Sequence, residues 1–515
     1  MLANYFILPL RNLRKHPVYS GINLAGLVLG TVCCLFILLY VRDHQGYDRQ
    51  HLGGERIYRI VSDLNGIGSN PLNTACISPP IAPTLQEDFP DVEQWTRLVD
   101  PPEVSQHLLR KGSRSFFETK GYYVDSTFFK VFNYHFVAGS PEKCLDEPFT
   151  VVLTQPVAEK LFGDAESAIG QGLDIDNRFG KHPFRVTGVV DNSAGKSHIE
   201  GHFYMTMRSG ELGDWVLANR SFGAQNFLYG YVKLFPKTDA AAFEAKLPDF
   251  IQKHGGDQLR EMGMQKVLHL EPIAAIHTES DRKNQLTPTV KKGFLNLLLM
   301  LATFVQGIAC INFMNLSTAR ASRRAKEVGI RKAIGARRGA LVAQFLAESL
   351  LLCGFAIFIA VPVVWLCLPY LNLITGADVQ FLLLRDTGIW AMLAGLVVVT
   401  GLVAGSYPAF YLSGFQPVKV LKGVFSGEKN KGAIQLRRGL VTAQFVIAIV
   451  LIAGALIVRQ QFVYLANIEL GFEKAQKIAV PFRIGEAQMA LESFKRETRS
   501  MAKVTARLAI RIFLY

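Results

Sequence analysis

The hydrophobic residues of this chain are concentrated in five long runs with few charged side chains, and polar segments of unequal length separate them. A helix needs about 20 apolar residues to cross the hydrocarbon core of a bilayer. Every run meets this requirement, so each predicts one membrane-spanning helix. The runs are Val18–Tyr40, Phe294–Met314, Leu341–Tyr370, Gly388–Leu412 and Gly439–Val458.

The long polar segment Arg42–Lys292, between the first two runs, shows shorter patterns. Phe149–Leu153 and Phe184–Val190 are rich in β-branched residues, which predicts strands. Pro156–Phe162 predicts a helix, because proline is favoured in a first turn and Gly163 follows the last residue. Strands that alternate with helices indicate an α/β or α+β domain.

Composition agrees with a membrane protein. Half of the 515 residues are hydrophobic, 19 % are charged and the mean hydropathy is +0.20, which excludes a disordered chain and a soluble enzyme. The formal net charge is +14, yet Arg42–Lys292 contains 28 basic and 32 acidic residues. The positive charge therefore lies beside the apolar runs, which is typical of a membrane protein and not of a nucleic-acid-binding domain.

The position of the basic residues predicts the orientation, because cytoplasmic loops carry an excess of lysine and arginine. Basic clusters lie at Arg11–Lys15, Arg320–Arg338 and Lys419–Arg438, whereas Leu371–Thr387 contains a single basic residue. All three clusters face the cytoplasm if the N-terminus is cytoplasmic and each run crosses once. We therefore expect a polytopic α-helical membrane protein of about five helices, with a large extracytoplasmic α+β domain at Arg42–Lys292.

The sequence contains only weak matches to catalytic, metal-binding and phosphate-binding motifs. Ser193–Ser197 is similar to a phosphate-binding loop but lacks the first glycine of that motif, which favours a solvated turn. His198 and His202 are four residues apart without a third ligand nearby, which favours a surface pair over a metal site. Cys76 and Cys144 could pair outside the cytoplasm, but their spacing carries no signal. We predict no catalytic residue, cofactor or metal ligand, and do not expect an enzyme.

Two runs contain glycines four residues apart, at Gly26 and Gly30 and at Gly401 and Gly405. Such spacing lets helices approach closely in lipid. Close helix packing and chance occurrence both remain open for these glycines.

The basic segment after the second run predicts a short helix. Glu327 and Arg331 are spaced for an ion pair, and Gly335 is placed to end the helix in the left-handed conformation. A basic helix of this kind could bind anionic lipid at the membrane surface. The alternative is a docking surface for a soluble partner.

Eleven further segments form a set of motifs along the chain. They are Ile22–Gly30, Tyr47–Asp48, Arg56–Arg59, Val151–Thr154, Lys160–Asp164, Val186–Val190, Cys310–Arg320, Glu327–Arg337, Gln344–Ser349, Gly405–Ala409 and Gln416–Val418. Through these motifs the chain resembles the FtsX-like and MacB-like permeases, membrane subunits of ATP-binding-cassette (ABC) transporters, over roughly residues 10–475.

The resemblance implies a coupling helix that sits in a groove of a separate ABC ATPase subunit. Its residues would be Glu327, Val328, Gly329, Ile330, Arg331, Lys332, Ile334, Gly335 and Arg337. Val328 and Ile334 would supply the buried contacts with the ATPase. A turn at Gly405–Ala409 and a second cytoplasmic element would follow the fourth helix, with the residues Pro408, Pro417 and Val418.

The resemblance also implies a function and a location. ATP hydrolysis by the partner, which would hold ATP and Mg, would move the periplasmic domain in export, lipoprotein extraction or mechanotransmission. Membrane lipid is a further expected partner, a permease homo- or heterodimer and a periplasmic adaptor are left open, and nucleic acid is not expected. The expected location is the bacterial inner membrane. The alternative is a membrane-anchored periplasmic sensor or scaffold without ATPase coupling.

The domains expected from the resemblance follow the order of the runs. They are an N-terminal segment and first helix at 1–41, a MacB-like periplasmic core domain at 42–292, an FtsX-like domain at 293–412 with a coupling loop at 318–338, a basic linker at 413–438, and a fifth helix with the incomplete start of a second copy at 439–515.

Overall fold

The computed structural model describes residues 17–66, 70–191, 195–319, 321–381, 386–414, 431–468 and 490–499. The chain forms two compact units. The first unit, here the membrane unit, contains residues 1–43 and 292–475, and the second contains residues 44–291 and 476–515. We call residues 44–291 the extramembrane domain.

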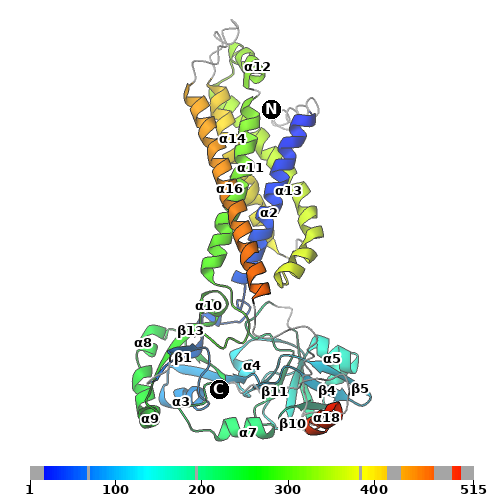
Figure 1. The fold of residues 1–515 in the computed structure, drawn as a ribbon, viewed down its shortest axis with the longest axis vertical. Helices are drawn as coiled ribbons and strands as arrows, with labels where there is room; N and C mark the ends of the chain where they lie inside the picture. Colours follow the sequence, from blue (N-terminus) through cyan, green and yellow to red (C-terminus); the bar gives the residue numbers. More distant parts are fainter. Residues whose placement is uncertain are drawn as a thin grey trace. The chain divides into compact units, whose positions relative to one another are not determined.

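The membrane unit contains five helices that are long and apolar enough to cross a bilayer, and all five predicted runs lie inside them. Each helix extends beyond its apolar run, because the polar residues at both ends continue the helical backbone. A short helix, α12, lies between the second and third spans (Figure 1). The helices are α2 (Pro17–Gln45), α11 (Lys292–Ala319), α12 (Ala321–Ala333), α13 (Arg338–Thr375), α14 (Thr387–Ser413) and α16 (Lys431–Asn467).

Four of the long helices pack around shared apolar clusters. One cluster joins α2, α11, α13 and α14 through Leu27, Phe313, Ala356 and Ala404. Within the bundle, the buried Gln306 side chain of α11 donates a hydrogen bond of 3.0 Å to the Thr400 hydroxyl of α14. In contrast, none of the residues in the apolar stretch of α16 is buried by the other described parts of the chain.

The four glycines with the predicted spacing lie at points of close helix contact. A Cβ atom added at Gly30 would lie 2.7 Å from the Ala309 Cβ of α11, and one at Gly26 would lie 3.1 Å from Asn312 Nδ2. In α14, a Cβ at Gly401 would lie 2.6 Å from Leu350 Cδ2, and one at Gly405 would lie 2.6 Å from Ser349 Oγ. At Gly30, Gly401 and Gly405 the neighbouring helix occupies the space of a Cβ atom, which favours glycine there. At Gly26 the end of the Asn312 side chain would have to shift by only a few tenths of an ångström.

The extramembrane domain contains a mixed sheet of 13 strands. The strands are β1 (Ile57–Gly66), β2 (Leu72–Thr74), β3 (Val92–Val99), β4 (His107–Lys111), β5 (Arg114–Glu118), β6 (Gly121–Val124), β7 (His135–Gly139), β8 (Thr150–Thr154), β9 (Gly172–Asn177), β10 (Gly180–Asp191), β11 (Phe203–Thr206), β12 (Tyr229–Leu234) and β13 (Met264–Pro272). The order is β13-β1-β12-β3-β6-β11-β8-β10-β9-β4-β5, with β2 beside β1 and β7 beside β10. The pairs β6–β11 and β8–β10 are parallel, and the other pairs are antiparallel.

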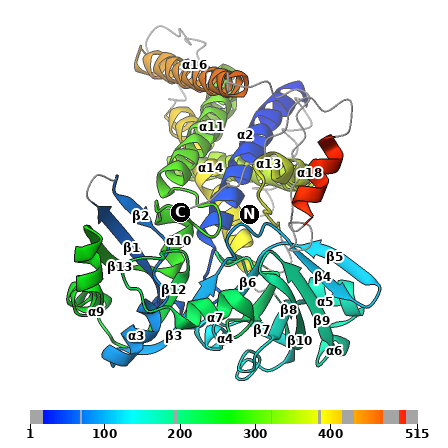
Figure 2. The same cartoon turned by 60° about the horizontal axis from the view of Figure 1, so that its bottom comes forward.

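Both faces of this sheet are buried, each under its own apolar cluster. Neighbouring residues of a strand point to opposite faces. In β8, Val151 and Leu153 belong to one cluster, whereas Val152 between them belongs to the other. Helices cover both faces, as two views of the domain show (Figures 1 and 2).

The helices of the second structural unit, which includes residues 476–515, are short. They are η1 (Gly54–Arg56), α3 (Ile81–Asp88), α4 (Phe128–Val131), α5 (Gln155–Phe162), α6 (Ala165–Ala168), α7 (Gly210–Ala218), α8 (Ala240–Glu244), α9 (Leu247–Glu261), α10 (Ile273–Glu279) and α18 (Leu491–Arg499). The predicted strands at 149–153 and 184–190 correspond to β8 and β10. The predicted helix Pro156–Phe162 is α5, and Gly163 after it has a φ of 98°. These predictions and the α+β fold class are confirmed.

Candidate functional site

Helix α12 is the predicted coupling segment, and its end has the geometry that Gly335 was expected to provide. Gly335 has a φ of 100°, a backbone conformation that favours glycine. Its N–H donates a hydrogen bond of 3.0 Å to Lys332 O, and the N–H of Ala336 donates one of 3.0 Å to Arg331 O. This pair of hydrogen bonds is a Schellman motif, which satisfies carbonyls that the helix end would leave without partners.

One face of α12 packs against the ends of α13 and α14. Val328 is 2 % exposed and lies in an apolar cluster with Leu341, Phe345, Ala409 and Leu412. The prediction that Val328 contacts an ATPase is therefore corrected, because its side chain is already buried within its own chain. Val328 instead holds α12 against the two long helices.

Polar contacts add to this attachment. The Lys332 Nζ donates a hydrogen bond of 2.6 Å to Ser413 O at the C-terminal end of α14. A positive charge is favourable there because the carbonyl groups at a helix C-terminus carry partial negative charge. The Arg331 guanidinium lies 2.6 Å from Glu327 and donates a hydrogen bond of 2.7 Å to Gln344 of α13. The predicted ion pair is present, and α12 is tied to both neighbouring helices.

The opposite face of α12 presents apolar side chains to the surroundings. Ile330 is 44 % exposed and Ile334, next to Gly335, is 82 % exposed. Arg337 is also exposed and is the N-cap residue of α13, whereas Gly329 is buried. The side of α12 opposite Val328 therefore presents two exposed isoleucines beside basic residues.

The predicted turn after the fourth span is not present. Residues Gly405–Ala409 are helical, and Pro408 is buried inside α14. Proline is tolerated in a membrane helix because neighbouring helices and side chains compensate for the lost backbone hydrogen bond. Pro417 and Val418 lie outside the described residues.

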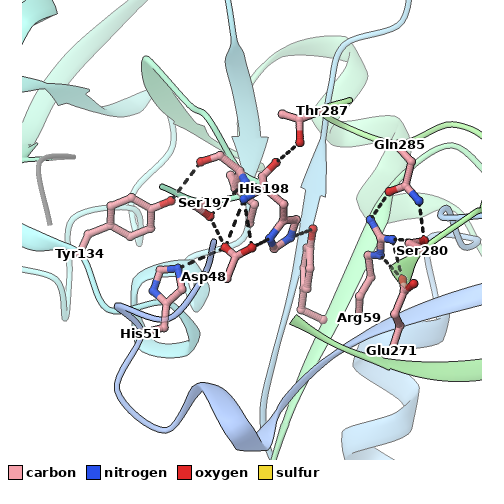
Figure 3. A network of polar contacts seen from close by, with 12 residues as sticks. Asp48, His51, Arg59, Tyr134, Ser197, His198, Glu271, Ser280, Gln285 and Thr287 are labelled. Atoms are coloured by element: carbon pink, nitrogen blue, oxygen red, sulfur yellow. Dashed lines mark hydrogen bonds and ion pairs between the residues drawn. The ribbon is translucent and has the colours of Figure 1, made fainter. Parts of the chain in front are cut away.

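The extramembrane domain contains a polar cluster that sequence reasoning missed. His198, expected in a surface pair with His202, is 1 % exposed, and neither histidine lies in a helix. The Nδ1 atom of His198 lies 2.8 Å from Asp48 Oδ2, while His202 pairs with Glu118. Ser197, expected in a solvated turn, is buried and donates a hydrogen bond to Asp48 (Figure 3). The surface-pair prediction is wrong for His198 and the solvated-turn prediction is wrong for Ser197, because the domain core encloses both side chains. Gly195 of the predicted turn is exposed, and Ser193 and Ala194 lie outside the described residues.

All seven cysteines are free thiols. Cys76 and Cys144 are buried, and burial raises the pKa of the Cys76 thiol to about 11 and that of Cys144 to about 12. Within the described residues, no group of three or more histidine, cysteine or carboxylate side chains is placed to hold a metal ion.

Two family models match the chain, and matched residues lie in both structural units. The MacB-like periplasmic core domain matches residues 20–250, and the FtsX-like permease C-terminal domain matches residues 299–417. The chain belongs to the FtsX/MacB-like family of ABC transporter permeases.

Several relatives of this permease are known. It is 25 % identical over 416 residues to the pyoverdine export ATP-binding/permease protein PvdT of Pseudomonas fluorescens, covering 78 % of this chain and 56 % of that protein. It is 24 % identical over 299 residues to the macrolide export ATP-binding/permease protein MacB of Rhodopirellula baltica, covering 55 % of this chain and 42 % of that protein. The chain thus spans about half the length of the curated relatives it matches.

Among solved structures, the periplasmic region of MacB from Actinobacillus actinomycetemcomitans is similar to 42 % of this chain and 90 % of its own length. The sequence identity is 18 % and the TM-score is 0.28.

Proposed function

We propose that this permease works with a separate ABC ATPase, which docks on α12 and drives movement of the extramembrane domain by hydrolysing ATP. The ATPase would hold ATP and Mg, and this chain would take no part in the chemistry. Export, lipoprotein extraction and mechanotransmission are all compatible with this mechanism. The names of the PvdT and MacB relatives include both ATP binding and export, which supports an ATP-driven process.

The observation that carries the proposal is the division of α12 into two faces. Val328 and Lys332 attach the helix to α13 and α14, whereas Ile330 and Ile334 remain exposed. A partner that moves the exposed face would therefore also move the ends of two membrane helices. A helix that served only to bind lipid would not need these attachments.

The distribution of charge supports a cytoplasmic position for α12. Of the 20 residues from 319 to 338, eight are basic and one is acidic. Cytoplasmic loops of membrane proteins show this excess. We therefore place α12 and the N-terminus in the cytoplasm, the extramembrane domain in the periplasm, and the chain in the bacterial inner membrane.

The direct test is co-purification of the cognate ATPase with the full chain from native membranes. Ile334→Ser should lower ATPase recovery about tenfold, since exposed apolar residues at the centre of an interface dominate binding. Leu373→Ser is the matched control, because Leu373 is also 82 % exposed but lies near the other end of α13. Equal recovery with both variants would contradict docking through α12.

Two further variants separate docking from lipid binding. Glu327→Lys breaks the ion pair with Arg331 but adds positive charge, so it should strengthen attraction to anionic lipid and weaken a shape-specific interface. Gly335→Val opposes the positive φ that ends α12 and should also reduce ATPase recovery. If wild-type membranes reproducibly yield no ABC ATPase, the sensor or scaffold function is favoured instead.

A further inference from the structure

The extramembrane domain has two connections to the spans that flank it in the chain. Residues 44–51, here the entry connection, follow the apolar part of α2, and residues 280–290, the exit connection, precede α11. Both lie within the extramembrane domain. We call a third stretch of that domain, residues 195–199, the inner segment. It forms hydrogen bonds with both connections.

Asp48 joins the entry connection to the inner segment through hydrogen bonds. Its carboxylate accepts hydrogen bonds from the Ser197 hydroxyl at 2.5 Å and from the His198 N–H at 3.2 Å, and lies 2.8 Å from His198 Nδ1. The Asp48 N–H also donates a hydrogen bond of 2.8 Å to Lys196 O. The carboxylate and the backbone N–H of Asp48 thus find their partners in three consecutive residues of the inner segment, 196–198.

The Asp48 contacts are buried, so breaking them without replacement by other partners requires a large free energy. Asp48 is 2 % exposed and His198 is 1 % exposed. Burial alone would raise the pKa of Asp48, but the charge of His198 and the hydrogen bonds from His198 and Ser197 outweigh it and lower the pKa. Asp48 also has a φ of 60°, which is uncommon for a residue other than glycine. Such a conformation persists where surrounding contacts determine it.

The exit connection is bonded to the same inner segment. The Thr287 hydroxyl donates a hydrogen bond of 3.1 Å to His198 O. Nearer its start, Gln285 accepts a hydrogen bond of 2.8 Å from the fully buried Arg59 of β1, which also pairs with Glu271 at 2.5 Å (Figure 3). His198 therefore lies between the two connections, with Asp48 on its side chain and Thr287 on its carbonyl oxygen.

A second set of contacts joins the entry connection to α10, the helix just before the exit connection. The ring nitrogens His44 Nδ1 and His277 Nε2 lie 2.7 Å apart. The Tyr47 ring stacks on the His277 ring with centroids 3.6 Å apart. The His277 carbonyl oxygen in turn accepts a hydrogen bond of 2.9 Å from the Val290 N–H. The two connections are thus linked through His198 and through His277.

We propose that the entry connection, the inner segment and the exit connection open and close as one cooperative unit, with the Asp48–His198 pair as its fastening. While it is closed, this set of three segments would hold the start of α11 at a fixed position relative to the end of α2. Asp48, His198 and Thr287 are then positioning residues that couple two membrane helices. The proposal stands on these contacts and does not require that an ATPase binds α12.

The test is hydrogen–deuterium exchange of the full chain in detergent micelles, with peptides covering all three segments. Asp48→Asn should raise the rate of exchange tenfold or more in the entry connection, the inner segment and the exit connection together. Thr287→Val should raise it about three- to tenfold in the same three segments, since it removes one neutral hydrogen bond. A rise confined to the connection that carries the substitution overturns the proposal.

The matched control uses another aspartate–histidine pair of the same domain. Asp88 of α3 lies 2.7 Å from His254 of α9, and neither residue belongs to the connections or to the inner segment. Asp88→Asn should leave exchange in all three segments unchanged, and a rise there would also overturn the proposal. Peptides from β11 report global unfolding. If Asp48→Asn accelerates β11 as well, the milder Thr287→Val variant alone decides the outcome.

Discussion

Lys266 of β13 is a lysine almost completely enclosed by the extramembrane domain. It is 5 % exposed, and its Nζ donates hydrogen bonds to Ser78 Oγ at 2.7 Å, Phe222 O at 2.7 Å and Asn226 Oδ1 at 2.6 Å. Burial lowers the pKa of Lys266 to about 7. Three oxygen acceptors therefore satisfy the ammonium group without neutralising its charge.

The lowered pKa of Lys266 makes stability depend on pH. Between pH 7 and the ordinary lysine pKa of 10.5, the unfolded state binds the proton and the folded state does not, so stability rises with pH. Below pH 7 both states are protonated and this dependence ends. Lys266→Met should remove up to about 1.4 kcal/mol per pH unit from the slope in this range.

The measurement is urea unfolding of the full chain in detergent micelles from pH 7 to pH 10, followed by tryptophan fluorescence. Lys143→Met, at an exposed lysine, should keep the wild-type slope. A wild-type slope in Lys266→Met would show that the folded protein keeps Lys266 charged throughout this range.

At the scale of elements, close packing of α14 against α13 depends on Gly401. Gly401→Ala would place a Cβ 3.0 Å from the Leu350 Cα as well as 2.6 Å from its side chain, so the backbones of the helices must move apart. We expect a loss of about 1–3 kcal/mol, which is typical of overpacking a well-packed core. Thermal unfolding of the full chain in detergent would show a lowered midpoint.

Gly395 in the same helix provides the matched control. A Cβ at Gly395 would have no heavy atom within 4 Å, so Gly395→Ala should leave the midpoint unchanged or raise it. Equal midpoints for the Gly401 and Gly395 variants would indicate that α13 and α14 do not pack as closely in detergent as in the structure.

At the scale of the whole molecule, the charge asymmetry predicts the topology. Reporter fusions after Asp100 and Gly376 should give a periplasmic signal, and fusions after Arg331 and Lys429 a cytoplasmic one, because basic loops stay in the cytoplasm. Paired reporters that are active on opposite sides of the membrane would measure both outcomes. A cytoplasmic signal at Asp100 would reverse the orientation and remove α12 from reach of a cytoplasmic ATPase.

Local patterns in the sequence determined the features that depend on neighbouring residues. The five spans follow from apolar length, α5 from its proline and from Gly163, and the end of α12 from Gly335. The motifs from Ile22–Gly30 to Gln416–Val418, taken together, indicated the permease family that the family models confirm. Each of these features depends on residues that are close together in the sequence. Hydropathy, capping residues and motif spacing can therefore predict it.

Tertiary structure alone decided which side chains meet. Val328 and Ile334 are both apolar residues of one basic segment, yet only packing against Leu341 and Leu412 shows that the first is buried and the second exposed. Asp48 and His198 are 150 residues apart, and the fold of the domain brings them together. No local pattern marks such pairs, because their contact depends on how distant segments pack and not on the residues beside them.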